Sequence, residues 1–172
     1  MEEVHIKPVT LDAIEELQNI GRQTFMETFA HCNSEQNMAA YLESGFNHEK
    51  LAAELTNNNS AFYFAVAAGK VVGYLKINYG VAQTELQDEH GFEIERIYVS
   101  QAYHGKKVGQ LLYEHAIAMA RQRKAQYVWL GVWENNTRAL RFYHKNGFEP
   151  FDKHVFKLGD DEQTDIMVKK ML

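Results

Sequence analysis

Residues 92–124 read FEIERIYVSQAYHGKKVGQLLYEHAIAMARQRK, and this stretch holds the strand and the helix around which the expected fold is built. Aromatic and β-branched side chains predict a strand over Phe92–Val99. After a loop over Ser100–Lys107, apolar residues recur at helical spacing and predict an amphipathic helix over Val108–Lys124. The next apolar run predicts a strand over Tyr127–Val132. The chain thus passes from strand to helix to strand, which implies some parallel pairing.

The remaining segments predict antiparallel strands beside this unit. Residues 61–67 and 71–79 flank the turn Gly69-Lys70 and form a predicted hairpin. The other expected strands are His5–Val9, His154–Leu158 and Ile166–Met171, the last two separated by an acidic turn. The other expected helices are Leu11–Ala30, Glu35–Leu42, His48–Leu55 and Asn136–Asn146. The fold class is therefore α+β (α/β in the broad sense), with a mixed, largely antiparallel central sheet of about seven strands flanked by helices.

The composition indicates one globular domain over residues 1–172. Hydrophobic residues make up 45% of the chain and charged residues 24%, which is close to the average soluble protein and excludes a disordered tail, a collagen and a coiled coil. No linker rich in serine, glycine or proline divides the sequence. A chain of this length is able to bury a core without disulfides or metals.

Charge and cysteine content exclude several classes of partner. Eighteen Lys and Arg against 23 Asp and Glu give a net charge of −5, so no broad basic field exists for nucleic acid. No apolar run approaches the ~20 residues of a membrane span. Residues Met1–Val9 carry Glu2 and Glu3 and lack the apolar segment of a secretory signal. Cys32 is the only cysteine, so we expect a cytoplasmic protein without a disulfide.

The loop His104–Gly109 is a candidate anion site. A glycine-containing loop at a helix start exposes backbone N–H groups, and the helix dipole adds positive potential there. Lys106 and Lys107 add two charges to an otherwise acidic protein. A nucleotide-binding P-loop is excluded, because only three residues separate Gly105 from Gly109. Taken alone, the loop fits a solvated helix cap as well as a phosphate site.

A second pattern one strand later decides between these readings. It consists of Val132, Asn136, Ala139, Phe142, Tyr143, Gly147 and Phe148. Together the two patterns resemble the GNAT superfamily of N-acetyltransferases, which use acetyl-CoA. The first signature of that family, Arg/Gln-x-x-Gly-x-Gly/Ala, falls on His104–Gly109, where Gly109 matches. Two positions depart: His104 replaces Arg/Gln, and Lys107 replaces the first signature glycine.

Four shorter segments resemble one branch of this superfamily. They are YLES at 41–44, EIERIY at 93–98, WLGVWE at 129–134 and GDDEQTD at 159–165. These segments are similar to the PaiA-type polyamine acetyltransferases, which act on spermidine and spermine. The resemblance implies a GNAT fold and a direct transfer of acetyl to a primary amine within a ternary complex.

The resemblance also implies where acetyl-CoA binds. The backbone of Ile97, Tyr98 and Val99 would hydrogen-bond the pantetheine arm as an added strand would. One of those N–H groups would polarise the thioester carbonyl. The residues that would hold the pyrophosphate are His104, Gly105, Lys106, Lys107, Val108 and Gly109. Those expected along the other side of the arm are Asn136, Phe142 and Tyr143.

The same resemblance assigns the proton transfers. An acceptor with a lysine-like pKa of about 10.4 must lose a proton before it attacks. Glu93 matches the family position for the base and is the first choice, and Glu95 is the second, since residues two apart on a strand face one side. Tyr143 occupies the general-acid position. From the residues alone, both glutamates also read as exposed strand carboxylates, and Tyr143 as a packed helix aromatic.

A polyamine needs acidic walls. Two segments are rich in acid residues: Glu85, Asp88, Glu89, Glu93 and Glu95 in one, and Asp160, Asp161, Glu162 and Asp165 in the other. Each also reads as a solvated loop or a simple turn. In the family, Glu27 and Tyr41 lie in the region that covers the acceptor. The predicted substrate residues are Glu27, Tyr41, Glu93 and Glu95.

Two other functions stay open. One is the same chemistry on another small amine or on a protein amino group, and the other is a regulatory protein that binds CoA without turnover. DNA binding is disfavoured, because no basic recognition helix is apparent. The histidines show no zinc-type pair spacing, so we expect no metal. Exposed edge strands are compatible with a homodimer.

Overall fold

The computed structural model describes residues 3–172. Met1 and Glu2, part of the segment considered above for a secretory signal, lie outside the described residues. The strands are β1 (Val4–Pro8), β2 (Ser60–Ala67), β3 (Lys70–Tyr79), β4 (Gly91–Val99), β5 (Tyr127–Trp133), β6 (Glu149–Leu158) and β7 (Asp161–Met171). The helices are α1 (Ile14–Phe29), α2 (Glu35–Gly45), α3 (His48–Leu55), α4 (Val108–Gln122) and α5 (Thr137–Lys145). Within residues 3–172, no helix combines the length and apolarity that a bilayer crossing requires.

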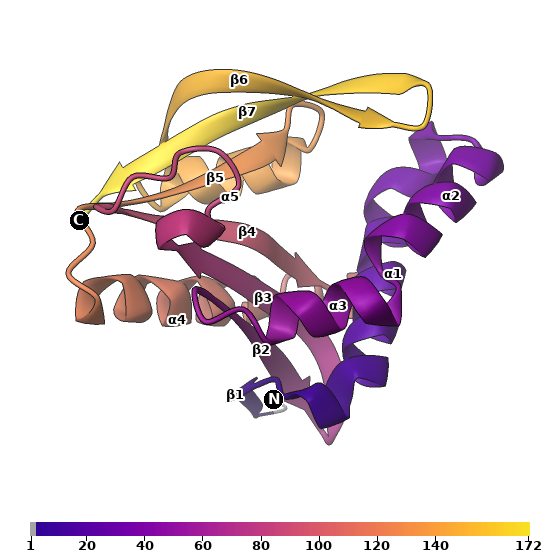
Figure 1. Ribbon diagram of the computed structural model, residues 1–172, viewed down its shortest axis with the longest axis horizontal. Coiled ribbons are helices and arrows are strands. Elements are labelled where there is room, and N and C mark those ends of the chain that lie inside the picture. The colour runs from indigo at the N-terminus through magenta and orange to yellow at the C-terminus, as the bar shows by residue number, and fades with distance from the viewer. Residues whose placement is uncertain (1–2) are drawn as a thin grey trace.

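The strands form one seven-stranded sheet in the order β1-β2-β3-β4-β5-β7-β6 (Figure 1). Neighbouring strands run antiparallel everywhere except between β4 and β5, which run parallel. The crossover between those two strands is α4, as the strand–helix–strand pattern predicts. The mixed, largely antiparallel sheet expected from the sequence is therefore confirmed.

The sheet opens where its parallel strands, β4 and β5, stop pairing with each other. β4 and β5 are in register over only three residue pairs, from Gly91↔Tyr127 to Glu93↔Trp129. Beyond these pairs β4 continues to Val99 and β5 continues to Trp133, and in the described chain the two strands no longer pair. The remaining β4 backbone therefore presents hydrogen-bonding groups on the side that β5 leaves open.

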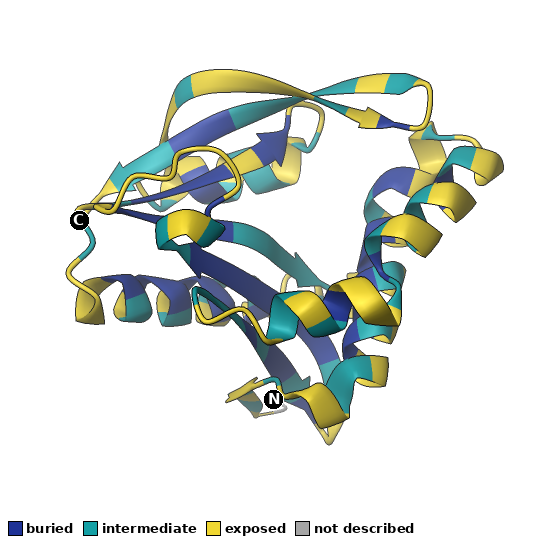
Figure 2. Ribbon diagram, in the orientation of Figure 1, coloured by how far each residue is buried: buried dark blue, intermediate teal, exposed yellow. Residues whose placement is uncertain are grey.

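Helices cover both faces of the sheet (Figure 1). α4 lies on one face, where Leu112, Ala116 and Ala120 are fully buried in a core that includes residues of β3, β4 and β5. α1, α2 and α3 surround a second core on the other face, with Leu17 and Leu51 at its centre. Figure 2 shows buried and exposed positions alternating along α4, as its amphipathic sequence predicts.

The predicted elements are present, and some bounds are corrected. α1 starts at Ile14 and is flanked by 3-10 turns at Leu11–Ala13 and Ala30–Cys32. α4 stops at Gln122, because Lys124 adopts a left-handed backbone with φ of 60°. α5 ends at Lys145, and the side chain of Asn136 caps it by accepting from the amide of Ala139.

The acidic run 159–165 is not a simple turn. Only Gly159 and Asp160 lie between the strands, and β7 begins at Asp161. Gly159 has a φ of +66°, which permits a tight connection, so the flanking residues are free to pair. β6 and β7 pair from Leu158↔Asp161 onward. The sequence prediction therefore set both strands too short.

Candidate active site

A cavity of about 1270 Å³ opens where β4 and β5 diverge. Its size exceeds the range of about 300–1000 Å³ that is usual for a single small ligand. The predicted site residues that line it are Glu27, Tyr41, Glu93, Glu95, Ile97, Tyr98, Val99, His104, Gly105, Lys107, Val108, Gly109, Asn136, Phe142 and Tyr143. Lys106 is the exception, with its ammonium 4.8 Å from the centre of the Tyr103 ring.

One end of the cavity is the N-terminus of α4. The residue at the N-cap position, Lys107, has a left-handed backbone, with φ of 64° and ψ of 16°, and its side chain does not cap the helix. The first N–H groups of the helix are thus left for an anion. His104 is tied back by a 2.8 Å hydrogen bond between its Nε2 atom and the carbonyl oxygen of Val99. The ring of His104 therefore braces the loop.

The left-handed backbone of Lys107 explains why the family signature has glycine there. We expect Lys107→Gly to raise the free energy of unfolding by about 0.5–1 kcal/mol, since the strain of about 1–2 kcal/mol outweighs the ~0.5–1 kcal/mol entropic cost of glycine. Lys106 is not among the positive-φ residues, so Lys106→Gly should lower stability by about 0.5–1 kcal/mol. Denaturant unfolding measures both. A Lys107→Gly protein less stable than the wild type would show that the left-handed backbone of Lys107 is not strained.

The opposite wall is α5. Tyr143 is 6% exposed, and its ring contacts those of Phe142 and Phe148 at centroid distances of 5.4 and 5.5 Å. Burial raises the pKa of Tyr143 above its ordinary value, so the hydroxyl keeps its proton at neutral pH. Tyr143 thus combines aromatic packing with a place on the cavity wall.

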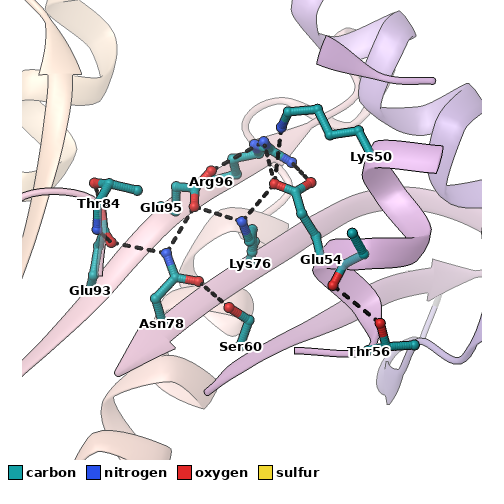
Figure 3. Close-up of polar contacts among 11 residues, drawn as sticks. Lys50, Glu54, Thr56, Ser60, Lys76, Asn78, Thr84, Glu93, Glu95 and Arg96 are labelled. Carbon is teal, nitrogen blue, oxygen red and sulfur yellow. Dashed lines mark hydrogen bonds and ion pairs between the residues drawn. The ribbon is translucent and has the colours of Figure 1, made fainter. Parts of the chain in front are cut away.

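Glu93 and Glu95 lie together, as their spacing predicts (Figure 3). The amide nitrogen of Asn78 donates to both carboxylates, at 2.9 Å to Glu93 Oε1 and 2.8 Å to Glu95 Oε1. The register of β3 and β4 shifts here, because Ile77 pairs with Ile94 and Lys76 with Arg96. Glu95 is therefore the extra residue of a β-bulge, a device that re-aims side chains near active sites.

Glu93 is nearly enclosed, with 3% of its surface exposed. Besides Asn78, it accepts from the backbone N–H of Thr84 at 2.9 Å and from the Thr84 hydroxyl at 2.5 Å. Burial raises the pKa of Glu93, and these hydrogen bonds oppose the rise. A raised pKa makes a carboxylate a stronger proton acceptor.

Glu95 has a different environment. Burial opposes its charge, but Arg96 and Lys76 outweigh burial and lower its pKa. Lys76 Nζ lies 2.7 Å from Glu95 and 2.9 Å from Glu54, and Arg96 Nη2 lies 3.1 Å from Glu95 and 3.2 Å from Glu54 (Figure 3). Glu54 is also desolvated, yet the same two cations, aided by Lys50, lower its pKa to about 2. Two neighbouring carboxylates thus have opposite tendencies, with Glu95 held ionised and Glu93 poised to take a proton.

The far end of the cavity is aromatic and acidic. The rings that line it are Phe25, Phe29, Tyr41, Trp133 and Phe156. Asp165 lies among them on β7, beside Glu85 and His154, whose Oε1 and Nδ1 atoms are 2.5 Å apart. Burial and the charge of Glu85 raise the pKa of Asp165 to about 6, although His154 opposes the shift. We call this part of the cavity the acceptor end.

Glu27 and Tyr41 both line the cavity and make different contacts. Tyr41 stacks on Phe25 with ring centroids 4.3 Å apart. Glu27 accepts from the backbone N–H of Gln101 at 2.9 Å, so it ties α1 to the loop that follows β4. Thr84 carries no sequence signal of its own, and Asp165 stands in the sequence only as one member of an acidic run.

Comparison with known proteins decides the family. The profile described as the Acetyltransferase (GNAT) family matches residues 15–148. The chain belongs to the GNAT acetyltransferase family.

Relatives and solved structures agree with this assignment. An N-acetyltransferase of uncharacterised function from Lactobacillus delbrueckii is 42% identical over 169 residues, 98% of each chain. The spermidine N(1)-acetyltransferase of Thermoplasma acidophilum is 23% identical over 171 residues, 97% of this chain and 96% of that relative. The crystal structure of the PaiA N-acetyltransferase from T. acidophilum in complex with coenzyme A has the same fold, with a TM-score of 0.82, 22% identity and 99% of both chains covered.

This GNAT protein is an N-acetyltransferase that acts with acetyl-CoA on an amine acceptor. Its cavity fits that co-substrate: the uncapped start of α4 suits a phosphate, the open side of β4 offers backbone groups, and the volume leaves room for an acceptor. In residues 3–172, no group of three or more His, Cys, Asp or Glu side chains is arranged to hold a metal ion.

Proposed function

We propose that this GNAT enzyme acetylates polyamines such as spermidine and spermine. The observation that carries the proposal is the acceptor end, where the Asp165 carboxylate faces a cavity lined by aromatic rings. Within residues 3–172, no hydrogen bond or ion pair engages the Asp165 side chain, whose pKa is raised by burial. A bound ammonium group would compensate that charge, and aromatic faces attract cations.

In this proposal the two ends of the cavity hold the two substrates. The start of α4 with Gly105, Lys107 and Gly109 holds the pyrophosphate, and Lys106 adds charge from outside the cavity. The β4 backbone at residues 97–99 holds the pantetheine arm, and Asn136 and Phe142 lie across from it. Acetyl-CoA supplies the acetyl group as a thioester.

Two side chains handle the protons. Glu93 takes a proton from the acceptor ammonium, which frees the nitrogen lone pair for attack. The Tyr143 hydroxyl holds a proton for the departing sulfur. Glu95 stays ionised among Lys76 and Arg96, and its negative charge favours protonation of Glu93.

The test is a series of acceptors that differ in charge: 1-aminobutane, 1,4-diaminobutane, spermidine and spermine. Thiol release from acetyl-CoA gives kcat/KM for each, with no acceptor as the blank. We expect kcat/KM to rise at least tenfold from the monoamine to spermidine. Equal values across the series contradict the polyamine proposal and leave another small amine or a protein amino group as the acceptor.

Asp165→Asn tests the acceptor end directly. We expect the variant to raise KM for spermidine about tenfold and leave KM for 1-aminobutane within about twofold, since a charge-assisted contact contributes ~1.5–3 kcal/mol. The variant should also be more stable at pH 7. The folded-state pKa of about 6 exceeds the ordinary 3.8, so ionisation destabilises the fold as pH rises through this window.

Denaturant unfolding at pH 4 and pH 7.5 checks the stability prediction. The wild type should lose stability relative to Asp165→Asn between these values. A variant that matches the wild type in both stability and KM for spermidine contradicts the role of Asp165.

Two organisational expectations complete the proposal. We infer that residues 1–172 act as one catalytic domain, which the single sheet and the cavity built from both halves of the chain support. We also place the enzyme in the cytoplasm, where Cys32, the lone cysteine, stays reduced.

A further inference from the structure

Glu93 has one exposed hydrogen-bonding partner. In residues 3–172, its carboxylate accepts from Asn78, which is fully buried, and from Thr84, which is exposed and lines the cavity. Thr84 contributes two hydrogen bonds to Glu93: its backbone N–H donates to Oε1, and its hydroxyl donates to Oε2 (Figure 3). The loop between β3 and β4 thus places a hydroxyl on the Glu93 carboxylate at the cavity wall.

The geometry points to Thr84 as the residue that relays the acceptor's proton to Glu93, an inference that rests on the proposed function. The N–H bond of the ammonium breaks and its proton bonds to Thr84 Oγ1. In concert, the proton of the Thr84 hydroxyl passes to Glu93 Oε2. Thr84 ends neutral as it began, Glu93 becomes a neutral carboxylic acid, and the amine nitrogen gains its lone pair.

Burial and hydrogen bonding make this route reasonable. Glu93 Oε1 is occupied by two donors, Asn78 and the Thr84 amide, whereas Oε2 has only the Thr84 hydroxyl as a partner in residues 3–172. A hydroxyl has one proton to donate and lone pairs to accept another, so it is able to pass a proton without changing charge. The short 2.5 Å Thr84–Glu93 contact is within the range of a charge-assisted O–H···O bond.

The charges around Glu93 bear on its pH dependence. On β4, Glu95 adds negative charge, which Arg96 of the same strand and Lys76 of β3 balance. β5 places the uncharged Trp129 opposite Glu93, and the loop contributes the uncharged Thr84.

The experiment compares Thr84→Val, which keeps shape and loses the hydroxyl, with Thr84→Ser, which keeps the hydroxyl. We expect Thr84→Val to lower kcat/KM for spermidine about 10- to 100-fold at pH 7.5, with KM for acetyl-CoA within twofold, and Thr84→Ser to stay within about threefold. Thr56→Val is the control, because the Thr56 hydroxyl bonds only within α3 in the described chain and lies outside the cavity.

Two readouts separate a relay from a structural role. The Thr84→Val defect should shrink as pH approaches the amine pKa near 10, where free amine needs no base. The double variant Thr84→Val/Glu93→Gln should be no slower than Glu93→Gln alone, since both groups act on one proton path.

Full activity of Thr84→Val, or a defect that adds to that of Glu93→Gln, overturns the relay while the wild-type turnover keeps the proposed function intact. A wild type that acetylates no amine overturns the proposed function and the relay with it. The wild-type rate therefore tells the two failures apart.

Discussion

Glu93→Gln is expected to lower kcat/KM for an amine acceptor by about 100-fold at pH 7.5, while KM for acetyl-CoA stays within about twofold. Glutamine keeps the shape of the side chain but cannot take up a proton, and general base catalysis contributes about 10²–10⁴-fold. The enclosed position of Glu93 and its raised pKa are the reasons to choose it over its neighbour. Initial rates of thiol release between pH 6 and pH 10 measure the effect.

The pH dependence of the rate shows whether Glu93 acts as the base. The Glu93→Gln rate should follow the free-amine fraction and approach the wild type near pH 10, so its dependence on pH should be steeper than that of the wild type. Glu95→Gln is the matched comparison, because Glu95 is held ionised by Lys76 and Arg96. If Glu95→Gln shows the steeper pH dependence and Glu93→Gln does not, the base is Glu95.

Lys76→Met is expected to lower the free energy of unfolding by about 3 kcal/mol. The Lys76 side chain is 6% exposed and bonds to Glu54 and Glu95, so its loss leaves two enclosed carboxylates with fewer cations. Removing one partner of a buried ion pair costs about 3–5 kcal/mol. The lower value applies here, because Arg96 still contacts both carboxylates.

Lys50→Met is the control at the exposed edge of this network. Its side chain is 42% exposed and forms an i, i+4 pair with Glu54, so its loss should cost less than about 0.5 kcal/mol. Urea unfolding of the two variants at pH 7 gives the comparison. Equal stabilities would show that the buried network does not hold β3, β4 and α3 together.

The sequence predicts the parts of the fold that local sequence patterns encode. The α4 stripe and the hairpin of β2 and β3 are local signals, and the structure has both. The predicted strands stopped short at the acidic run 159–165, because its charged residues are typical of a turn. In the structure they pair along β6, an edge strand whose residues are mostly exposed to solvent.

The site residues also fall into two groups, those that the sequence indicates and those that only the fold brings together. The resemblance located Glu93 and the α4 loop, because both belong to segments that recur in the family. The Lys76–Glu54 and Arg96–Glu54 contacts join residues 22 and 42 positions apart, and no local pattern encodes them. Thr84 lies nine positions from Glu93 in a polar loop, so only the folded chain shows that its hydroxyl meets the carboxylate.

The identity of the product is the most direct test of polyamine acetylation by this enzyme. Purified protein is mixed with acetyl-CoA and spermidine, and mass spectrometry follows acetylated amine alongside released CoA. We expect one monoacetylated polyamine for each CoA released, and no CoA release above the blank without acceptor. Tight acetyl-CoA binding with no acetylated product from any amine would contradict this expectation and favour a protein that senses CoA.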